Sequence, residues 1–212
     1  MSFSVLEKEG MLHGINHLSS LDSKIKYLLN TFDLPELKVE KNYFWSLCRS
    51  IIYQQISGKA AKTIASRFLE LFPSDVNIEP VEVLDMDINK FYAVGLSRQK
   101  ANYIKNIAEA FESQIIDEKI IKKCNDDDII KILTQIKGVG RWTAEMFLIF
   151  TLRRPDVFPV TDLGVQKGFQ IFYSLDDLPT IDDMNKKSEN WKPYRSIMAL
   201  YLWYIVEGPF EW

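Results

Sequence analysis

Helical periodicity constrains this chain most, because apolar residues recur at intervals of three and four along most of its length. In "NYFWSLCRSIIYQQI" (residues 42–56), Phe44, Leu47 and Ile51 fall on one helix face. No stretch shows the sustained alternation of a half-buried strand. We therefore expect an all-α fold. The same helical spacing recurs in residues 61–72, 101–111 and 129–136.

Two segments near the C-terminus are apolar nearly all round. These are "WTAEMFLIFTL" (residues 142–152) and "KPYRSIMALYLWYIV" (192–206). Such composition predicts buried helices, and we expect Pro193 in the first turn of the second one. The chain shows no internal repeat, low-complexity segment or obvious linker, so residues 1–212 are expected to form a single all-α unit.

Composition narrows the class of protein further. The 212 residues are 47% hydrophobic and 26% charged, as in ordinary globular proteins. No run approaches the ~18 apolar residues of a membrane span, and the N-terminus lacks a signal-peptide layout, so we expect a cytoplasmic protein without a membrane partner. Two cysteines exclude a four-cysteine iron–sulfur cluster. His13 and His17 could bind zinc, but two solvent-facing histidines are the simpler interpretation.

The net charge of −3 argues weakly against a nucleic-acid partner. The distribution of charge matters more, because three segments contain lysine or arginine and no acid: residues 58–67, 96–105 and 129–144. Lys100 and Lys105 belong to the second segment. These segments could form one basic face, and charge scattered over helices is an equal alternative.

A glycine turn between two apolar helices carries the first sign of chemistry. In "LTQIKGVGRWTA" (residues 133–144), Gly138 and Gly140 are flanked by Lys137 and Arg141. Glycines allow close backbone approach, and N–H groups at a helix start can bind an anion such as a phosphate of a nucleic-acid strand. Taken alone, the turn is a weak signal, and an ordinary corner between helices is the simpler interpretation.

"IKGVGRWTA" followed by "DVFPVTDLGVQK" resembles the helix–hairpin–helix DNA glycosylase superfamily. "IIYQQISGKAAKTIASRF", "GLSRQKANYIKNIAEAF" and "WKPYRSIMALYLWYIVEG" resemble further blocks of its 3-methyladenine DNA glycosylase II branch. The resemblance spans residues 20–208 in order. It implies two all-α lobes with a DNA-binding cleft between them, approximately residues 57–155 and residues 1–56 plus 156–212. Larger bacterial members carry an additional N-terminal β-rich domain, for which this chain has no room.

The resemblance also implies an activity. We expect a monomeric, monofunctional DNA glycosylase that hydrolyses the N-glycosidic bond of alkylated purines, chiefly 3-methyladenine, during base excision repair. Its partner would be double-stranded DNA with damaged bases, which places it at the nucleoid in the cytoplasm. The alternatives are a glycosylase of the same fold for oxidised or mismatched bases, a non-catalytic DNA-binding module and an all-α protein scaffold.

Asp162 in "VTDLG" is the candidate catalytic residue. From its position at a loop-to-helix junction it could simply cap the helix. The resemblance matches it to the family's catalytic aspartate, whose carboxylate stabilises a cation-like sugar. The two roles are compatible. No histidine follows His17, which suits an alkylated base that already leaves easily.

Bifunctional relatives place a lysine nucleophile just after the hairpin, where this chain has Trp142. Indole cannot form a Schiff base, so we expect hydrolysis without AP lyase activity. The resemblance also places Trp142 and Trp203 in the base pocket, where electron-rich rings would attract a cationic base. Phe44 and Trp45 are further pocket candidates, and core packing is the alternative for these aromatic residues.

A flipped base leaves a gap that a side chain must fill. The resemblance places this plug at Gln55 in "YQQIS", with Ile56 as a possible wedge. No cofactor is required, although backbone carbonyls of Thr134, Ile136 and Val139 match a family site for Na⁺ or K⁺. The expected DNA contacts are Gln55, Ile56, Ser57, Lys59, Lys137, Gly138, Val139, Gly140, Arg141 and Thr143.

Overall fold

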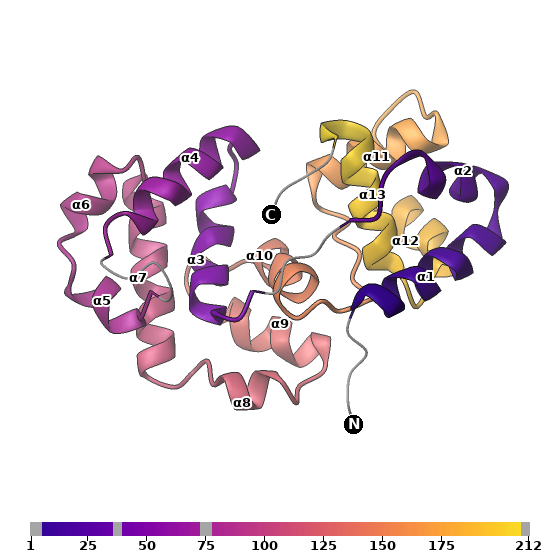
Figure 1. The fold of residues 1–212 in the computed structure, drawn as a ribbon. Coiled ribbons are helices and arrows are strands. Elements are labelled where there is room, and N and C mark those ends of the chain that lie inside the picture. Colours follow the sequence, from indigo (N-terminus) through magenta and orange to yellow (C-terminus); the bar gives the residue numbers. More distant parts are fainter. Residues whose placement is uncertain (1–5, 36–39, 73–77, 209–212) are drawn as a thin grey trace. The chain divides into compact units, whose positions relative to one another are not determined.

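The computed structural model describes residues 6–35, 40–72 and 78–208, and every regular element in these ranges is a helix (Figure 1). The all-α prediction is therefore confirmed. Within the same ranges, no helix combines the length and apolarity needed to cross a bilayer. Contacts divide the chain into a hairpin unit, Glu40–Phe147, and a terminal unit, formed by Ser2–Val39 and Leu148–Trp212.

These boundaries differ from the expected lobes, 57–155 and 1–56 plus 156–212, in the placement of α3 (Tyr43–Tyr53). This helix packs against α4 (Gly58–Leu69) and α7 (Arg98–Glu112), so it belongs with the hairpin. Its apolar face explains the difference, since Leu47 and Ile51 are fully buried. Periodicity showed that this face is buried but not which helices bury it.

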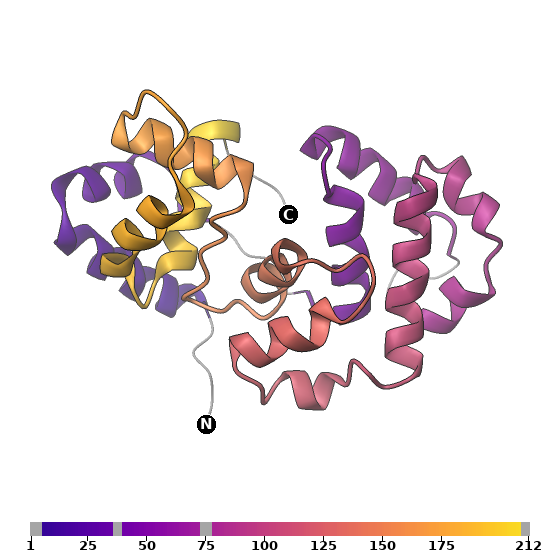
Figure 2. The same ribbon diagram turned by 180° about the vertical axis from the view of Figure 1, so that it is seen from behind.

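α7 is the central helix of the hairpin unit and contacts α3, α5 and α6, as seen from behind in Figure 2. Ser97 caps it by accepting a hydrogen bond from the backbone N–H of Lys100 at 3.2 Å. Ile104 and Ile107 are fully buried. The remaining helices of this unit are α5 (Pro80–Asp85), α6 (Ile88–Ala93), α8 (Glu118–Ile121), α9 (Asp126–Thr134) and α10 (Arg141–Met146).

The long apolar segment after the hairpin forms α10 and then a π-helical turn, Phe147–Thr151. Residues 143–151 are buried throughout, which confirms the predicted burial. The widened turn was not predicted, because an apolar run does not distinguish α from π geometry.

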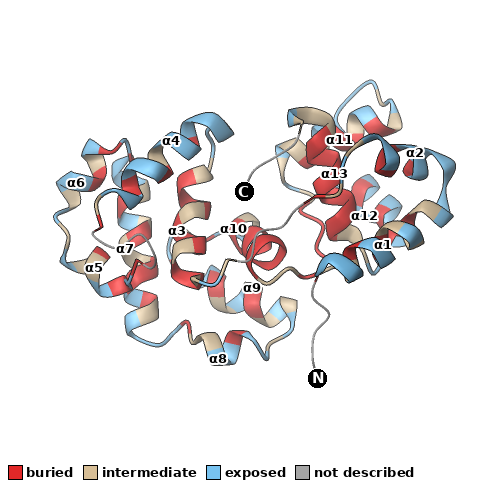
Figure 3. Ribbon diagram, in the orientation of Figure 1, coloured by how far each residue is buried: buried red, intermediate tan, exposed pale blue. Residues whose placement is uncertain are grey.

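In the terminal unit, α11 (Leu163–Tyr173) and α13 (Arg195–Glu207) pack closely. A side chain at Gly168 would overlap the backbone carbonyl of Leu202, so glycine is needed at this crossing. Residues 196–204 of α13 are buried, and Figure 3 shows the red buried stretch of this helix. The unit is completed by α1 (Lys8–Leu21), α2 (Ser23–Thr31), α12 (Ile181–Ser188) and a short 3-10 turn, Glu189–Trp191.

The start of α13 corrects one expectation, because the helix begins at Arg195 and leaves Pro193 before its first turn. Asp156 explains this boundary. Its Oδ1 accepts hydrogen bonds from the Arg195 backbone N–H at 3.4 Å and from Nε at 2.7 Å. A carboxylate at this end of the helix also complements the helix dipole.

The N-terminal helix α1 is an integral part of the terminal unit, with Met11 and Leu18 buried. His13 and His17 lie against the ring of Tyr194, with centroid distances of 5.9 and 5.5 Å. These contacts give the two histidines a packing role. Among the described residues, no group of three or more His, Cys, Asp or Glu side chains could hold a metal ion.

Candidate active site and nucleic-acid interface

Asp162 lies immediately before α11 and caps it, as one of its two predicted roles requires. Its Oδ1 accepts a hydrogen bond from the backbone N–H of Val165 at 2.8 Å. The same oxygen accepts a second bond from Nε1 of Trp203, also at 2.8 Å. Two donors on one oxygen fix the position of a carboxylate that is still partly exposed.

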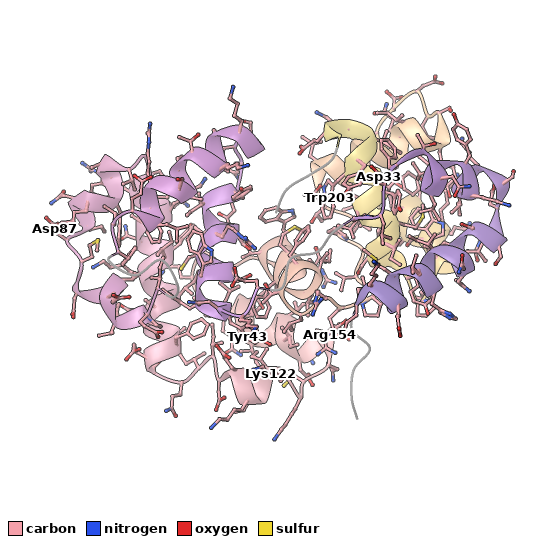
Figure 4. The ribbon with its side chains drawn as sticks, viewed as in Figure 1. Asp33, Tyr43, Asp87, Lys122, Arg154 and Trp203 are labelled. Carbon is pink, nitrogen blue, oxygen red and sulfur yellow. The ribbon has the colours of Figure 1, made fainter. Side chains whose placement is uncertain are left out.

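Trp203 on α13, which is labelled in Figure 4, is therefore a direct hydrogen-bond partner of the candidate catalytic acid. Only 4% of the residue is exposed, and its ring packs on Phe150 at a centroid distance of 5.7 Å. We predicted that Trp203 lines the base pocket and missed its hydrogen bond to Asp162. Its contact with a base stays a prediction.

Gly164 allows this indole to approach the carboxylate. A Cβ at Gly164 would lie 2.7 Å from Cδ1 of Trp203 and 3.1 Å from Oδ1 of Asp162. Both distances are shorter than ordinary contacts with a real side chain. The glycine two positions after the aspartate in "VTDLG" was the only sign of this arrangement in the sequence.

The two glycines of the hairpin differ in what they do. Gly138 has a φ of +104°, and a side chain there would overlap the ring of Tyr103 on α7. Gly140 is the N-cap residue of α10 with a φ of −88°, and a Cβ on it would meet nothing within 4 Å. The fold thus explains Gly138, whereas Gly140 faces open space. A glycine that the fold does not require leaves room for another molecule's backbone.

Residues of the hairpin unit hold the hairpin loop from two sides. Asn106 donates a hydrogen bond to the carbonyl oxygen of Lys137 at 2.9 Å. Nε2 of Gln54 donates to the carbonyl oxygen of Gly138 at 3.2 Å and to Oγ1 of Thr143 at 2.9 Å. These hydrogen bonds tie the loop to α7 and to the end of α3, and neither Asn106 nor Gln54 was predicted from the sequence.

The predicted DNA contacts within the hairpin have different degrees of exposure. Lys137 and Arg141 are exposed, and Nε of Arg141 donates to Oε1 of Glu145 at 2.9 Å. Thr143 is only 1% exposed, and its hydroxyl faces Gln54. The prediction of Thr143 as a DNA contact is corrected to a role inside the unit. Val139 is 4% exposed, and its contact with DNA stays a prediction.

The loop between α3 and α4 has the exposure expected of a plug. Gln55 and Ile56 are exposed, and Gln55 adopts a φ of +57°, in the left-handed region. Ser57 caps α4 by accepting from the N–H of Ala60 at 3.4 Å, and Lys59 is exposed in the first turn of α4. A non-glycine residue in the left-handed region needs support from its surroundings.

The aromatic candidates of the hairpin unit fall into two groups. Phe44 is 3% exposed and packs edge-on against Phe111, so its assignment to the base pocket is corrected to the core. Trp45 is half-buried and stacks on Phe68 at a centroid distance of 5.9 Å. Trp142 is half-buried at the start of α10. Base contacts by Trp45 and Trp142 stay predictions.

Two lysines of the expected basic face, Lys100 and Lys105, point at backbone carbonyls inside the hairpin unit. Nζ of Lys100 donates to the carbonyls of Ile52 and Gln54 at 2.8 and 2.7 Å. Nζ of Lys105 donates to two carbonyls at the end of α5 and just beyond it, at 3.0 and 2.9 Å. Burial lowers the pKa of Lys100. These lysines hold helices together, which charge counting along the sequence could not reveal.

The expected monovalent cation would use the carbonyls of Thr134, Ile136 and Val139. Thr134 ends α9, where helix carbonyls are exposed and the dipole favours a cation. The carbonyl of Ile136 accepts a hydrogen bond from the N–H of Val139 at 2.9 Å, which leaves it a second lone pair. This donor chemistry fits Na⁺ or K⁺, and the ion stays a prediction.

Comparison with known proteins identifies similar sequences over most of the chain. The profile of the HhH-GPD superfamily of base excision DNA repair proteins matches residues 48–193. DNA-3-methyladenine glycosylase 1 of Schizosaccharomyces pombe is 36% identical over 211 residues, covering 96% of this chain and 92% of that protein. DNA-3-methyladenine glycosylase of Saccharomyces cerevisiae is 31% identical over 241 residues, covering 95% and 77%.

A solved structure agrees with the sequence comparisons. It is the Schizosaccharomyces pombe 3-methyladenine DNA glycosylase in complex with abasic DNA, which matches with a TM-score of 0.87 and 35% identity. The match covers 94% of this chain and 100% of that one.

Proposed function

Because the chain belongs to the HhH-GPD superfamily of base excision DNA repair proteins, we propose that it is a DNA glycosylase acting on alkylated purines. It hydrolyses the N-glycosidic bond, and 3-methyladenine is its chief substrate. The observation that carries this assignment is the environment of Asp162. Its Oδ1 accepts hydrogen bonds at 2.8 Å from the backbone N–H of Val165 and from the indole N–H of Trp203. Relatives at 31% and 36% identity that bear the name DNA-3-methyladenine glycosylase support the substrate class.

The carboxylate of Asp162 acts on the sugar. Departure of the base leaves a cation-like sugar, and a fixed negative charge beside it lowers the barrier. The two hydrogen bonds from Val165 and Trp203 hold this charge in place before substrate arrives. Such preorganisation avoids the cost of reorienting the group during the reaction. A water molecule then completes the hydrolysis.

Trp142 is the reason that the reaction ends with release of the base and does not continue to strand cleavage. The family resemblance places this indole at the position of the lysine nucleophile of bifunctional enzymes, and tryptophan lacks an amine that could attack the sugar. The enzyme therefore releases the base without cutting the strand. An electron-rich indole also attracts a methylated, positively charged purine, and this attraction is worth ~1–2 kcal/mol.

Double-stranded DNA is bound through two exposed loops of the hairpin unit. Gln55 enters the gap left by the flipped base, with Ile56 beside it. The open space at Gly140 admits the backbone of one strand, and Lys137 and Arg141 stand on either side of the turn. The chain acts as a monomer, with Na⁺ or K⁺ at the carbonyls after α9 as a bridge to phosphate.

Substitution of Asp162→Asn tests this function. Asparagine keeps an oxygen for Val165 and Trp203 but removes the negative charge, so folding and DNA binding persist while base release collapses. Release of bases from methylated duplex DNA and Kd for a duplex containing an abasic-site analogue are the measurements. Asp177→Asn, at an exposed position in the loop after α11, is the matched control and retains full release.

Full release by Asp162→Asn would refute the mechanism. If the wild-type protein released bases from oxidised but not from methylated DNA, its substrates would be oxidised bases, and the fold assignment would stand. Strand cleavage at the resulting abasic site without alkali would contradict the assignment of Trp142.

A further inference from the structure

The end of α3 is joined to two other elements by four side-chain hydrogen bonds. Lys100 on α7 donates to the carbonyls of Ile52 and Gln54 at 2.8 and 2.7 Å. The side chain of Gln54 donates to the Gly138 carbonyl at 3.2 Å and to the Thr143 hydroxyl at 2.9 Å. All of these contacts lie within the hairpin unit. The resemblance gave no role to either Gln54 or Lys100.

Lys100 completes a helix end that the backbone leaves open. The last carbonyls of a helix have no partner inside the helix, and a cation there also interacts favourably with the dipole. Gln55 follows directly, in the left-handed region at a φ of +57°. Such a conformation persists only where the surroundings fix it. By binding the carbonyl of Gln54, Lys100 fixes the residue from which the plug extends.

Gln54 connects the same point to the hairpin. Its amide nitrogen bridges the residue that turns the hairpin, Gly138, and the buried hydroxyl of Thr143 in α10. The loop that carries the plug and the loop that faces the strand are therefore connected at one point. We call this point, formed by Gln54, Gly138 and Thr143, the joint. Because Gln54 points inward at this joint while Gln55 is exposed, the two adjacent glutamines have separate tasks.

We propose that Gln54 and Lys100 are positioning residues that hold the plug loop, residues 54–57, against the hairpin. Gln55 then enters the duplex in register with the strand that the hairpin holds. This inference rests on the proposed function, in which Gln55 fills the gap left by the flipped nucleotide. Its physical basis is preorganisation, since a loop already fixed in its bound conformation loses less entropy on binding.

Gln54→Met tests the joint, because methionine has a similar length and no charge but lacks both N–H donors. The probes are a duplex with a tetrahydrofuran abasic-site analogue opposite 2-aminopurine and the same duplex without the analogue. We expect Kd for the abasic duplex to rise about tenfold and Kd for the intact duplex to change less than about twofold. The change in 2-aminopurine fluorescence on binding, which reports entry of the plug, is expected to shrink.

Gln170→Met is the matched control. Gln170 also donates its amide to a backbone carbonyl, that of Asp176 at 3.0 Å, but it lies on α11 in the terminal unit. The Gln170→Met variant should lose the same kind of hydrogen bond and keep the wild-type preference for abasic DNA. Lys100→Met is expected to reduce that preference and Lys100→Arg to restore part of it. If Lys100 acted only through its charge on DNA, Lys100→Met would instead weaken binding to the abasic and the intact duplex equally, which would contradict the positioning role.

Thr143→Val is the milder probe if Gln54→Met folds poorly, because it removes only the hydroxyl acceptor. If one joint carries the effect, the double variant Gln54→Met/Thr143→Val should lose no more affinity than Gln54→Met alone. Additive losses would overturn the proposal. So would an unchanged preference for abasic DNA in Gln54→Met.

Failure of the proposed function would look different. In that case the wild-type protein would neither release methylated bases nor prefer the abasic duplex. A wild-type protein that does both, together with a Gln54→Met variant that matches it, would reject the positioning role alone.

Discussion

At the scale of single residues, the structure assigns Asp162 two simultaneous tasks. Its Oδ1 caps α11 through Val165 and accepts the indole N–H of Trp203 at 2.8 Å. A helix cap holds its carboxylate still, which is also what charge stabilisation in a transition state requires. The cap and the proposed catalytic role are therefore compatible, because both need a fixed carboxylate. Gly164 completes the arrangement by leaving space for the indole.

Trp203→Phe separates the hydrogen bond from the aromatic packing. Phenylalanine keeps a ring against Phe150 but cannot donate to Asp162. We expect kcat for base release to fall about ten- to a hundredfold, because a hydrogen bond to a charged group is lost. Kd for an abasic duplex should stay close to wild type. Single-turnover release and fluorescence titration are the measurements.

Trp191→Phe provides the comparison for Trp203→Phe. Trp191 is 1% exposed and packs among Phe158, Phe169 and Tyr173 in the same unit. Its replacement should lower Tm through lost packing and leave release per folded molecule unchanged. An equal loss of release in both variants would show that general packing, rather than the indole N–H, supports the reaction.

At the scale of elements, the hairpin separates a glycine required by the fold from one that the fold does not require. Gly138→Ala places a side chain at a φ of +104° against Tyr103, so we expect a loss of about 1–3 kcal/mol in the free energy of unfolding. Gly140→Ala meets nothing in the chain and should cost less than about 1 kcal/mol. Yet Gly140→Ala is expected to raise Kd for DNA roughly tenfold.

Thermal unfolding measures the stability of the two variants, and DNA titration measures their Kd. Together they show which glycine serves the fold and which serves DNA binding. Each variant is the control for the other, because the substitution is identical and the positions are two residues apart. If Gly140→Ala binds DNA as tightly as wild type, the strand does not approach the hairpin at this glycine.

The elements also show what the sequence could and could not predict. Helices such as α3 and the cap at Asp162 follow from spacing and junction chemistry over a few residues, so both were predicted. The bond from Trp203 to Asp162 spans 41 positions, and those from Gln54 to the hairpin span 84 and 89. Such pairs depend on packing between helices, which periodicity does not encode. The choice between core and pocket for Phe44 stayed open in the sequence for the same reason, because an aromatic residue on an apolar face has no signal that separates the two.

At the scale of the whole molecule, a chain with a net charge of −3 has to bind a polyanion through few local contacts. Lys100 and Lys105 are held by carbonyls inside the hairpin unit, so they add little to phosphate binding. Among the predicted DNA contacts, the exposed cations are Lys59, Lys137 and Arg141. Binding should therefore depend only moderately on salt and draw more of its free energy from the extruded nucleotide.

The salt dependence of binding to intact DNA makes this argument quantitative. If three cations each neutralise one phosphate, log K falls with log salt with a slope of about −2.7, since each contact contributes about −0.9. Lys137→Gln should make the slope less steep by about 0.9, and Lys105→Met should leave it unchanged, because that ammonium lies on carbonyls of the hairpin unit. Titrations at several salt concentrations measure all three slopes. A steep slope in the wild-type protein, or equal changes in both variants, would mean that DNA contacts a broader basic surface than these two loops provide.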